Sequence, residues 1–110
     1  MVYRKFIIED DNLILGRVGY HKELCSNLLD LTKVKGGGLW SFDDEKTIIL
    51  FDKSFQFGAV SIKDIKKCIE LNQVFSNQYR TRKLENYTFY FRNDYGEKIL
   101  ISNQDEKLKR

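Results

Sequence analysis

Short apolar and alternating runs predict that most of this chain forms β-strands. Residues 2–8 are rich in β-branched and aromatic side chains and end at an acidic turn, residues 9–12. The apolar pattern resumes at residues 13–15, so these segments predict a β-hairpin. Gly16 and Gly19 are expected to break its second strand, because glycine weakens a strand interior.

Two further hairpins are predicted later in the chain. Residues 39–42 and 47–51 are strand-like runs, and the charged loop 43–46 connects them. Residues 87–92 alternate aromatic and mixed positions, and the apolar run 98–101 returns after a short polar turn.

Two segments follow the three-to-four spacing of an amphipathic helix, residues 20–32 and residues 61–72. Ser61 is a good N-cap for the second helix, and Asp64 occupies the capping-box position three residues later. Asn72 is expected to end that helix. The apolar positions that carry the spacing are Leu24, Leu28 and Leu31 in the first segment and Ile62, Ile65 and Ile69 in the second.

The resulting order, β-β-α-β-β-α-β-β, predicts an α+β fold with about six strands in a mixed or antiparallel sheet flanked by two helices. A chain of 110 residues forms one domain, 1–110, because it is too short for two cores. Residues 75–86 are predicted to form a polar, basic loop, and residues 103–110 a charged tail.

The composition limits the classes of partner. Hydrophobic residues at 42% and charged residues at 32% are typical of a soluble globular protein. No apolar run approaches the ~20 residues of a membrane span, and the N-terminus lacks a secretory cleavage pattern. We therefore expect a cytoplasmic protein without a membrane partner. A net charge of +3 permits anionic ligands but argues against nucleic acid.

Cys25 and Cys68 lie far apart, each within a predicted helix. With no C-x-x-C pair and a single histidine, the sequence predicts no zinc site, and no metal or other cofactor is expected. The two cysteines are predicted to be reduced, buried thiols.

Glycine-rich and turn-forming residues between 35 and 58 indicate a candidate anion site. Three consecutive glycines, residues 36–38, carry no Cβ, so a ligand or another strand can approach their backbone. The turn at residues 54–58 precedes a helix start and can direct several N–H groups at one anion. Structural alternatives remain open: the glycines can serve close strand packing, and Ser54 can cap the turn through its hydroxyl.

Four motifs occur in the order and approximate spacing of a known family: Tyr-His-Lys-Glu-Leu at 20–24, Gly-Gly-Gly-x-x-Ser at 36–41, the strand at 46–51, and Ser-x-x-Phe-Gly at 54–58. In these motifs the chain resembles the protein histidine phosphatase family, the phosphohistidine phosphatases that include the Janus and Ocnus proteins of flies. The resemblance covers roughly residues 3–94.

The resemblance implies roles for individual residues. The family's histidine is the general base that activates water, and His21 matches it. The family's phosphate-cradling loop corresponds to Ser54, Phe55 and Gln56, whose main-chain N–H groups would hold the phosphate. The complete set of ligand-binding residues that we expect is Arg4, Arg17, Gly37, Gly38, Ser54, Phe55 and Gln56.

Two departures from the family concern cations. The family has an arginine directly after the three glycines, where this chain has Leu39, and Arg17 is only close in sequence to a second family arginine. A lysine of the family's first strand is matched by Arg4 or Lys5. Because phosphoryl transfer depends on positioning and on neutralising charge, losing two cations costs on the order of several kcal/mol of transition-state stabilisation. The match thus predicts an anion pocket more strongly than catalysis.

Three functions follow as hypotheses. The first is a phosphatase that acts on phosphohistidine or another phosphoramidate, in a protein or a small ligand. The second is a module that captures a phosphorylated ligand or a nucleotide without turnover. The third is a nucleic-acid or protein-interaction domain that uses the basic residues 80–83 and the aromatic hairpin from residue 87.

Several of these residues also have a purely structural interpretation. His21 can be a solvated residue of a first helical turn, and the basic residues 80–83 can belong to a solvated loop. The aromatic residues Trp40, Phe42, Phe89 and Phe91 are predicted to pack in the core.

Overall fold

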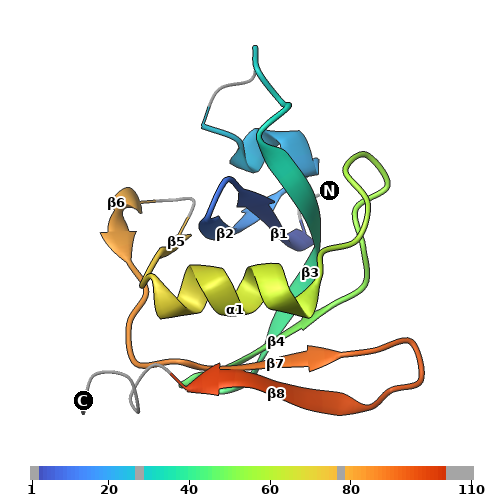
Figure 1. Ribbon diagram of the computed structural model, residues 1–110, viewed down its shortest axis with the longest axis vertical. Helices are drawn as coiled ribbons and strands as arrows, with labels where there is room; N and C mark the ends of the chain where they lie inside the picture. The colour runs from blue at the N-terminus through green and yellow to red at the C-terminus, as the bar shows by residue number, and fades with distance from the viewer. Residues whose placement is uncertain (1–2, 27–28, 77–78, 104–110) are drawn as a thin grey trace.

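One mixed sheet of eight strands carries the fold in the computed structural model, which describes residues 3–26, 29–76 and 79–103 (Figure 1). The β2–β5 and β4–β7 pairs are parallel, and the other neighbours are antiparallel. The chain is thus a single α+β domain. In sheet order, the strands are β6 (Tyr79–Lys83), β5 (Val74–Ser76), β2 (Asn12–Val18), β1 (Tyr3–Glu9), β3 (Val34–Asp44), β4 (Thr47–Phe51), β7 (Thr88–Arg92) and β8 (Lys98–Asn103).

The three predicted hairpins are present as β1–β2, β3–β4 and β7–β8. The prediction that Gly16 breaks the second strand is wrong, since β2 continues to Val18. Gly16 stays in register opposite Lys5. Its carbonyl oxygen accepts a hydrogen bond of 3.1 Å from the indole N–H of Trp40, so a tertiary contact holds the glycine in the strand.

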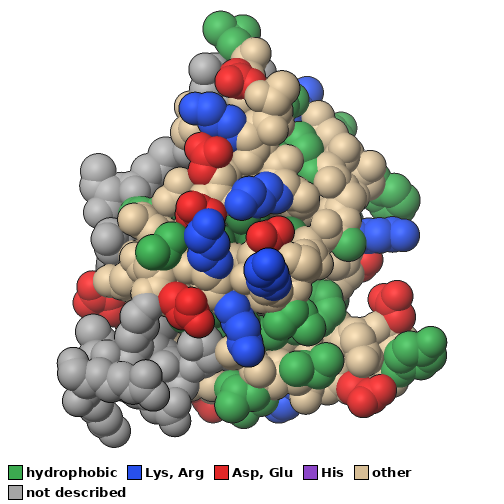
Figure 2. All heavy atoms as spheres, viewed as in Figure 1, with side chains coloured by type: hydrophobic (Ala, Val, Ile, Leu, Met, Phe, Trp, Pro, Cys, Tyr) green, Lys and Arg blue, Asp and Glu red, His purple; other side chains and the backbone are tan. Residues whose placement is uncertain are grey.

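The second predicted helix is confirmed as α1 (Ile62–Glu70). The hydroxyl of Ser61 accepts a hydrogen bond of 3.1 Å from the backbone N–H of Asp64, as an N-cap does. Asn72 adopts the left-handed conformation at φ 55° and donates its N–H to the carbonyl of Ile69, which ends the helix. Figure 2 shows lysines gathered over the outer face of α1, with acidic side chains between them.

The first predicted helix is wrong. Of residues 20–32, only η1 (His21–Leu24) is helical among those described, as a single 3₁₀ turn, and Cys25 is already extended. The carboxylate of Glu9 accepts hydrogen bonds of 3.1 and 3.3 Å from the N–H of Ser26. In a continuing helix, the N–H of Ser26 would donate to a carbonyl oxygen of the same helix. Here it donates to Glu9 of β1 instead, so the helix does not continue.

Two strands were not expected, so the sheet exceeds the predicted six. Both β5 and β6 lie mainly in residues 75–86, which the sequence predicts as a loop. The short β5 pairs with β2, so its stability comes from the sheet edge rather than from local propensity. The side chains of Arg80, Arg82 and Lys83, and residues 104–110 of the predicted tail, lie outside what the structure describes.

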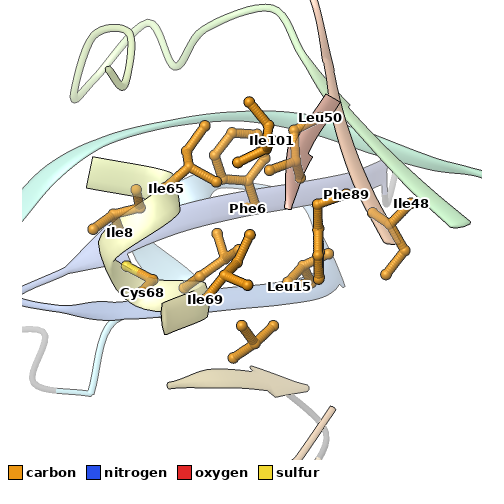
Figure 3. Packing of buried hydrophobic residues seen from close by; sticks show 12 residues of the cluster. Phe6, Ile8, Leu15, Ile48, Leu50, Ile65, Cys68, Ile69, Phe89 and Ile101 are labelled. Carbon is orange, nitrogen blue, oxygen red and sulfur yellow. The ribbon is translucent and has the colours of Figure 1, made fainter. Parts of the chain in front are cut away.

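From Phe6 to Glu9, both faces of β1 are buried. On one face, α1 packs its apolar stripe on the sheet (Figure 3). That cluster contains Phe6, Ile8, Leu13, Leu15, Ile48, Leu50, Ile65, Cys68, Ile69, Val74, Phe89 and Ile101. On the other face, η1 covers a smaller cluster of Ile7, Ile14, Val18, Leu24 and Cys25. The helix α1 and the 3₁₀ turn η1 therefore lie on opposite sides of the sheet.

The aromatic side chains are only partly in the core. Phe89 is fully buried, and Trp40 and Phe91 pack against the main cluster. Phe42 is 46% exposed, so its prediction as a core residue is wrong. Its ring packs edge-on against Trp40 at 5.2 Å.

The two cysteines are buried, and neither forms a disulfide. Burial raises the pKa of the Cys68 thiol to about 12. Cys25 follows η1 and lies outside any helix, contrary to the prediction. Over the described part of the chain, no helix has the length and apolar character that crossing a membrane requires.

Candidate functional site

His21 lies in η1 and packs against the glycines of β3. A Cβ added to Gly37 would stand 3.0 Å from Cδ2 of His21 and 2.5 Å from the carbonyl oxygen of Phe6. Only a glycine leaves room for both the neighbouring strand and the imidazole. The three glycines therefore have a structural role here: Gly37 makes room for His21, whereas Gly36 and Gly38 allow close packing of Ala59 and Phe51.

One hydrogen bond sets the tautomer of His21. Nε2 lies 2.8 Å from the carbonyl oxygen of Gly38. A carbonyl oxygen only accepts, so Nε2 carries the proton and the neutral ring keeps its lone pair on Nδ1.

Nδ1 is accessible, although the residue is only 9% exposed. Nδ1 has no hydrogen-bond partner among the described residues. No buried side-chain nitrogen or oxygen in that part of the chain lacks a partner. Nδ1 therefore reaches the surface, where it can accept a proton.

The surroundings of His21 keep it neutral. Burial is the main cause that lowers its pKa below 6.5, and the positive charge of Lys5 acts in the same direction. The hydrogen bond to Gly38 and the carboxylate of Asp52 oppose this shift without reversing it. At pH 7 the imidazole is thus an unprotonated base.

The turn at residues 54–58 is attached to the same glycine strand. The N–H of Gly37 donates to the carbonyl of Gly58 at 3.0 Å, and the N–H of Gly58 donates to the carbonyl of Ser54 at 2.8 Å. The Ser54 hydroxyl is buried and accepts from the N–H of Phe57 at 3.1 Å, so it caps the turn. The structure therefore brings together His21, Gly37, Gly38 and this turn.

The tip of the turn presents two backbone donors. Within the described residues, the N–H groups of Phe55 and Gln56 have no acceptor, whereas Ser54, Phe57 and Gly58 all donate within the turn. The Phe55 side chain is fully exposed. Two adjacent free N–H groups on an exposed turn are the kind of arrangement that binds an anion.

Lys5 supplies positive charge on the His21 face of the sheet. It alternates along β1 with Phe6, which faces α1, and its Nζ donates to the carbonyl of Gly19 at 2.7 Å. In register, Lys5 lies opposite Leu39, the apolar residue found where the family resemblance leads us to expect arginine.

Arg92 is a second cation on the His21 face of the sheet, and the sequence analysis did not predict it as a site residue. Leu39 pairs with Phe51, and Phe51 pairs with Arg92 of the parallel strand β7. The Arg92 guanidinium lies 4.3 Å from the centre of the Phe51 ring. Only the long-range β4–β7 pairing reveals this neighbour, and no local pattern signals it.

Arg4 and Arg17 are not brought to His21. They face each other across β1 and β2, on the sheet face that also bears Phe6 and Leu15. The Arg4 guanidinium lies 5.4 Å from the ring centre of Trp40 and 5.5 Å from that of Phe42. Of the two adjacent cations of β1, Lys5 lies on the His21 face and Arg4 on the opposite face.

The described residues include no group of three or more His, Cys, Asp or Glu side chains that could hold a metal ion. Fold and site together define a mostly β, α+β domain with a candidate oxyanion site. In comparisons with family models, curated proteins and solved structures, nothing matches this chain. Similarity to protein histidine phosphatases therefore stays a prediction from the motifs.

Proposed function

We propose that this protein hydrolyses the P–N bond of phosphohistidine or of another phosphoramidate, carried by a protein or a small molecule. One arrangement of groups carries the proposal. His21 is neutral at pH 7 and keeps an accessible lone pair on Nδ1. Its ring packs against Gly37 of β3, and the N–H of Gly37 is bonded to the turn whose tip has two free N–H groups. A base beside an oxyanion cradle is what attack of water on a phosphoryl group requires.

Each group has a role in the proposed reaction. The N–H groups of Phe55 and Gln56 donate to the phosphoryl oxygens and fix the phosphorus atom. Nδ1 of His21 takes a proton from water while the water oxygen bonds to phosphorus. The P–N bond breaks and its electron pair stays on the nitrogen side, which leaves as a neutral amine or imidazole because the substrate enters with its leaving group already protonated. His21 then releases its proton to bulk water, and the other product is inorganic phosphate.

Cleavage of a P–N bond needs fewer cations than cleavage of a phosphate ester, and the described residues give this site few. A protonated leaving nitrogen departs without negative charge, so it needs less cationic help than the oxygen of a phosphate ester does. Lys5 and Arg92 lie on the His21 face, while the apolar Leu39 and Phe51 stand between them in register. We therefore expect slow turnover, and phosphoramidates as better substrates than esters.

Capture of a phosphorylated ligand without hydrolysis is the second candidate. Two observations favour it: Leu39 provides no charge, and one of the three Lys5 donors is already bonded to Gly19. Backbone N–H groups alone hold an anion but neutralise little of the charge that develops in the transition state. In this case His21 would line the pocket and accept a hydrogen bond from a protonated phosphate.

An assay of phosphate release tests the proposal. Purified protein is incubated with phosphoramidate and with a phosphohistidine peptide, and inorganic phosphate is followed by ³¹P NMR. We expect release by the parent chain and a loss of at least about 100-fold in His21→Gln, because glutamine can still donate to Gly38 but is not a base.

The matched control for this assay is Lys66→Gln on the exposed face of α1, which is expected to be fully active. Two outcomes would contradict the proposal. Absence of phosphate release by the parent chain would exclude hydrolysis and make ligand capture the next candidate. Undiminished activity of His21→Gln would exclude His21 as the base.

A further inference from the structure

A pocket lies where β1 begins and β2 ends, and residues of β3 and β4 complete its lining. Its volume is about 330 Å³, and its lining residues are Tyr3, Arg4, Arg17, Leu39, Trp40 and Phe51. Leu39 and Phe51 line it from the sheet face that bears His21, whereas Arg4, Arg17 and Trp40 lie on the opposite face. The proposed phosphatase reaction uses neither arginine, so their place in the pocket requires its own explanation.

The two arginines form an uncompensated like-charge pair. Arg4 stands directly opposite Arg17 in the antiparallel ladder, and both side chains are exposed. Like charges in this position destabilise a sheet. Among the described residues, neither guanidinium forms an ion pair, whereas Lys35 and Lys67 share the carboxylate of Asp11 at 3.4 and 3.5 Å. The guanidinium groups of Arg4 and Arg17 thus give this pocket a positive charge that no ion pair among the described residues offsets.

Trp40 makes the wall of this pocket rigid. Its indole N–H donates to the main-chain carbonyl oxygens of Lys5 at 3.0 Å and of Gly16 at 3.1 Å, which fixes the ring across β1 and β2. The Arg4 guanidinium lies over that ring at 5.4 Å. A guanidinium held against an aromatic ring loses little conformational freedom when its N–H groups bind a ligand.

We propose that Arg4 and Arg17 bind an oxyanion, the phosphate or carboxylate group of a ligand, in this pocket, from the sheet face opposite His21. Guanidinium groups bind such anions through two parallel N–H···O bonds, which are stronger than neutral hydrogen bonds. A bound anion also removes the repulsion between the two arginines. The inference does not depend on hydrolysis at His21.

Tryptophan fluorescence reports on the pocket directly, because Trp40 is the only tryptophan in the chain. The protein is titrated with inorganic phosphate, with O-phosphoserine and with acetate, each at constant ionic strength in sodium chloride. We expect a saturable change of Trp40 emission at millimolar phosphate. Tighter binding of the phosphate compounds than of acetate would assign a phosphoryl ligand, and the reverse order would assign a carboxylate.

Charge-neutral variants give the decisive comparison. Arg4→Gln and Arg17→Gln are each expected to weaken binding by about tenfold or more, as the loss of a charge-assisted contact does. Lys66→Gln removes the same charge from the exposed face of α1, so this variant should bind like the parent chain. An absence of saturation, or equal binding by Arg17→Gln and Lys66→Gln, would overturn the proposal.

Thermal unfolding in phosphate-free buffer supplies the check on folding. Arg17→Gln removes the like-charge repulsion, so its Tm should equal or exceed that of the parent chain. A clearly lower Tm would contradict the like-charge argument on which the proposal is built.

Discussion

Nε2 of His21 donates to the carbonyl oxygen of Gly38 across 2.8 Å, and this contact fixes which nitrogen of the ring is the base. It directs the lone pair of Nδ1 away from the sheet. The neighbouring Gly37 provides the space for the ring, since any Cβ there would meet Cδ2 of His21 at 3.0 Å. The chemistry proposed for the site therefore begins with the backbone of β3.

The pH dependence of stability should reveal the environment of His21. Burial holds its pKa in the folded protein below the ordinary value of 6.5. In the window between the lowered pKa and 6.5, the unfolded chain binds more protons than the folded chain. Stability should therefore rise with pH through that window and become constant above it.

Urea unfolding measured from pH 5 to 8 tests this dependence. His21→Gln lacks the titrating group, so the difference in unfolding free energy between the parent chain and this variant should change with pH below 6.5 and stay constant above it. A difference that does not depend on pH would show that the imidazole is not desolvated in the folded state.

Gly37→Ala should disturb both the fold and the site. The added methyl group would meet the Phe6 carbonyl oxygen at 2.5 Å and the His21 ring at 3.0 Å. Relief of such overpacking typically costs about 1–3 kcal/mol, and displacement of the ring should abolish hydrolysis.

Gly96→Ala is the matched control, because nothing lies within 4 Å of the added Cβ, although its φ of +81° carries a conformational cost. It should lose about 1–2 kcal/mol and keep its activity. Equal activity of Gly37→Ala and the parent chain would show that the position of the His21 ring does not depend on the space left by Gly37.

Leu39→Arg should raise the rate of phosphoramidate hydrolysis. Leu39 lies opposite Lys5 on the His21 face, so an arginine there adds positive charge where the transferring oxygens develop negative charge. One well-placed cation is worth on the order of 10-fold or more in rate. The rate constant kcat is compared with that of Leu100→Arg, which places the same charge on an exposed position of β8. No gain over this control would show that missing charge does not limit turnover.

The sequence predicted those elements whose signals are local. The hairpins follow from short β-rich runs joined by polar turns, and α1 follows from the Ser61 cap and its apolar stripe. The first helix was mispredicted because Glu9, a residue of β1, captures the N–H of Ser26. The strand β5 was missed because it depends on pairing with β2.

The faces of β1 explain why Arg4 was assigned to the His21 pocket in place of Lys5. Phe6, Ile7 and Ile8 are all fully buried, so the strand shows no alternation between apolar and polar positions. Without that alternation, sequence reasoning cannot tell which of two adjacent cations faces His21. The register with β3 resolves the choice, because it places Lys5 beside Leu39 on the face of Gly37.

The grouping of His21 with the glycines and the turn was predictable from motif order. The tautomer of His21 and the free N–H groups of Phe55 and Gln56 were not, because each depends on a hydrogen bond between segments distant in sequence. The apolar position Leu39 remains the principal departure from the family that the motifs resemble.

Amide chemical shifts under phosphate titration test the central claim, an oxyanion pocket between His21 and the turn, most directly. In ¹⁵N–¹H spectra at pH 7, the N–H signals of Phe55 and Gln56 should move saturably with millimolar phosphate, because both donors are free in the described structure. The signals of Ser54 and Gly58 should move less, since their N–H groups are already bonded within the turn. Unmoved Phe55 and Gln56 signals at saturating phosphate would contradict the pocket and both functions proposed for it.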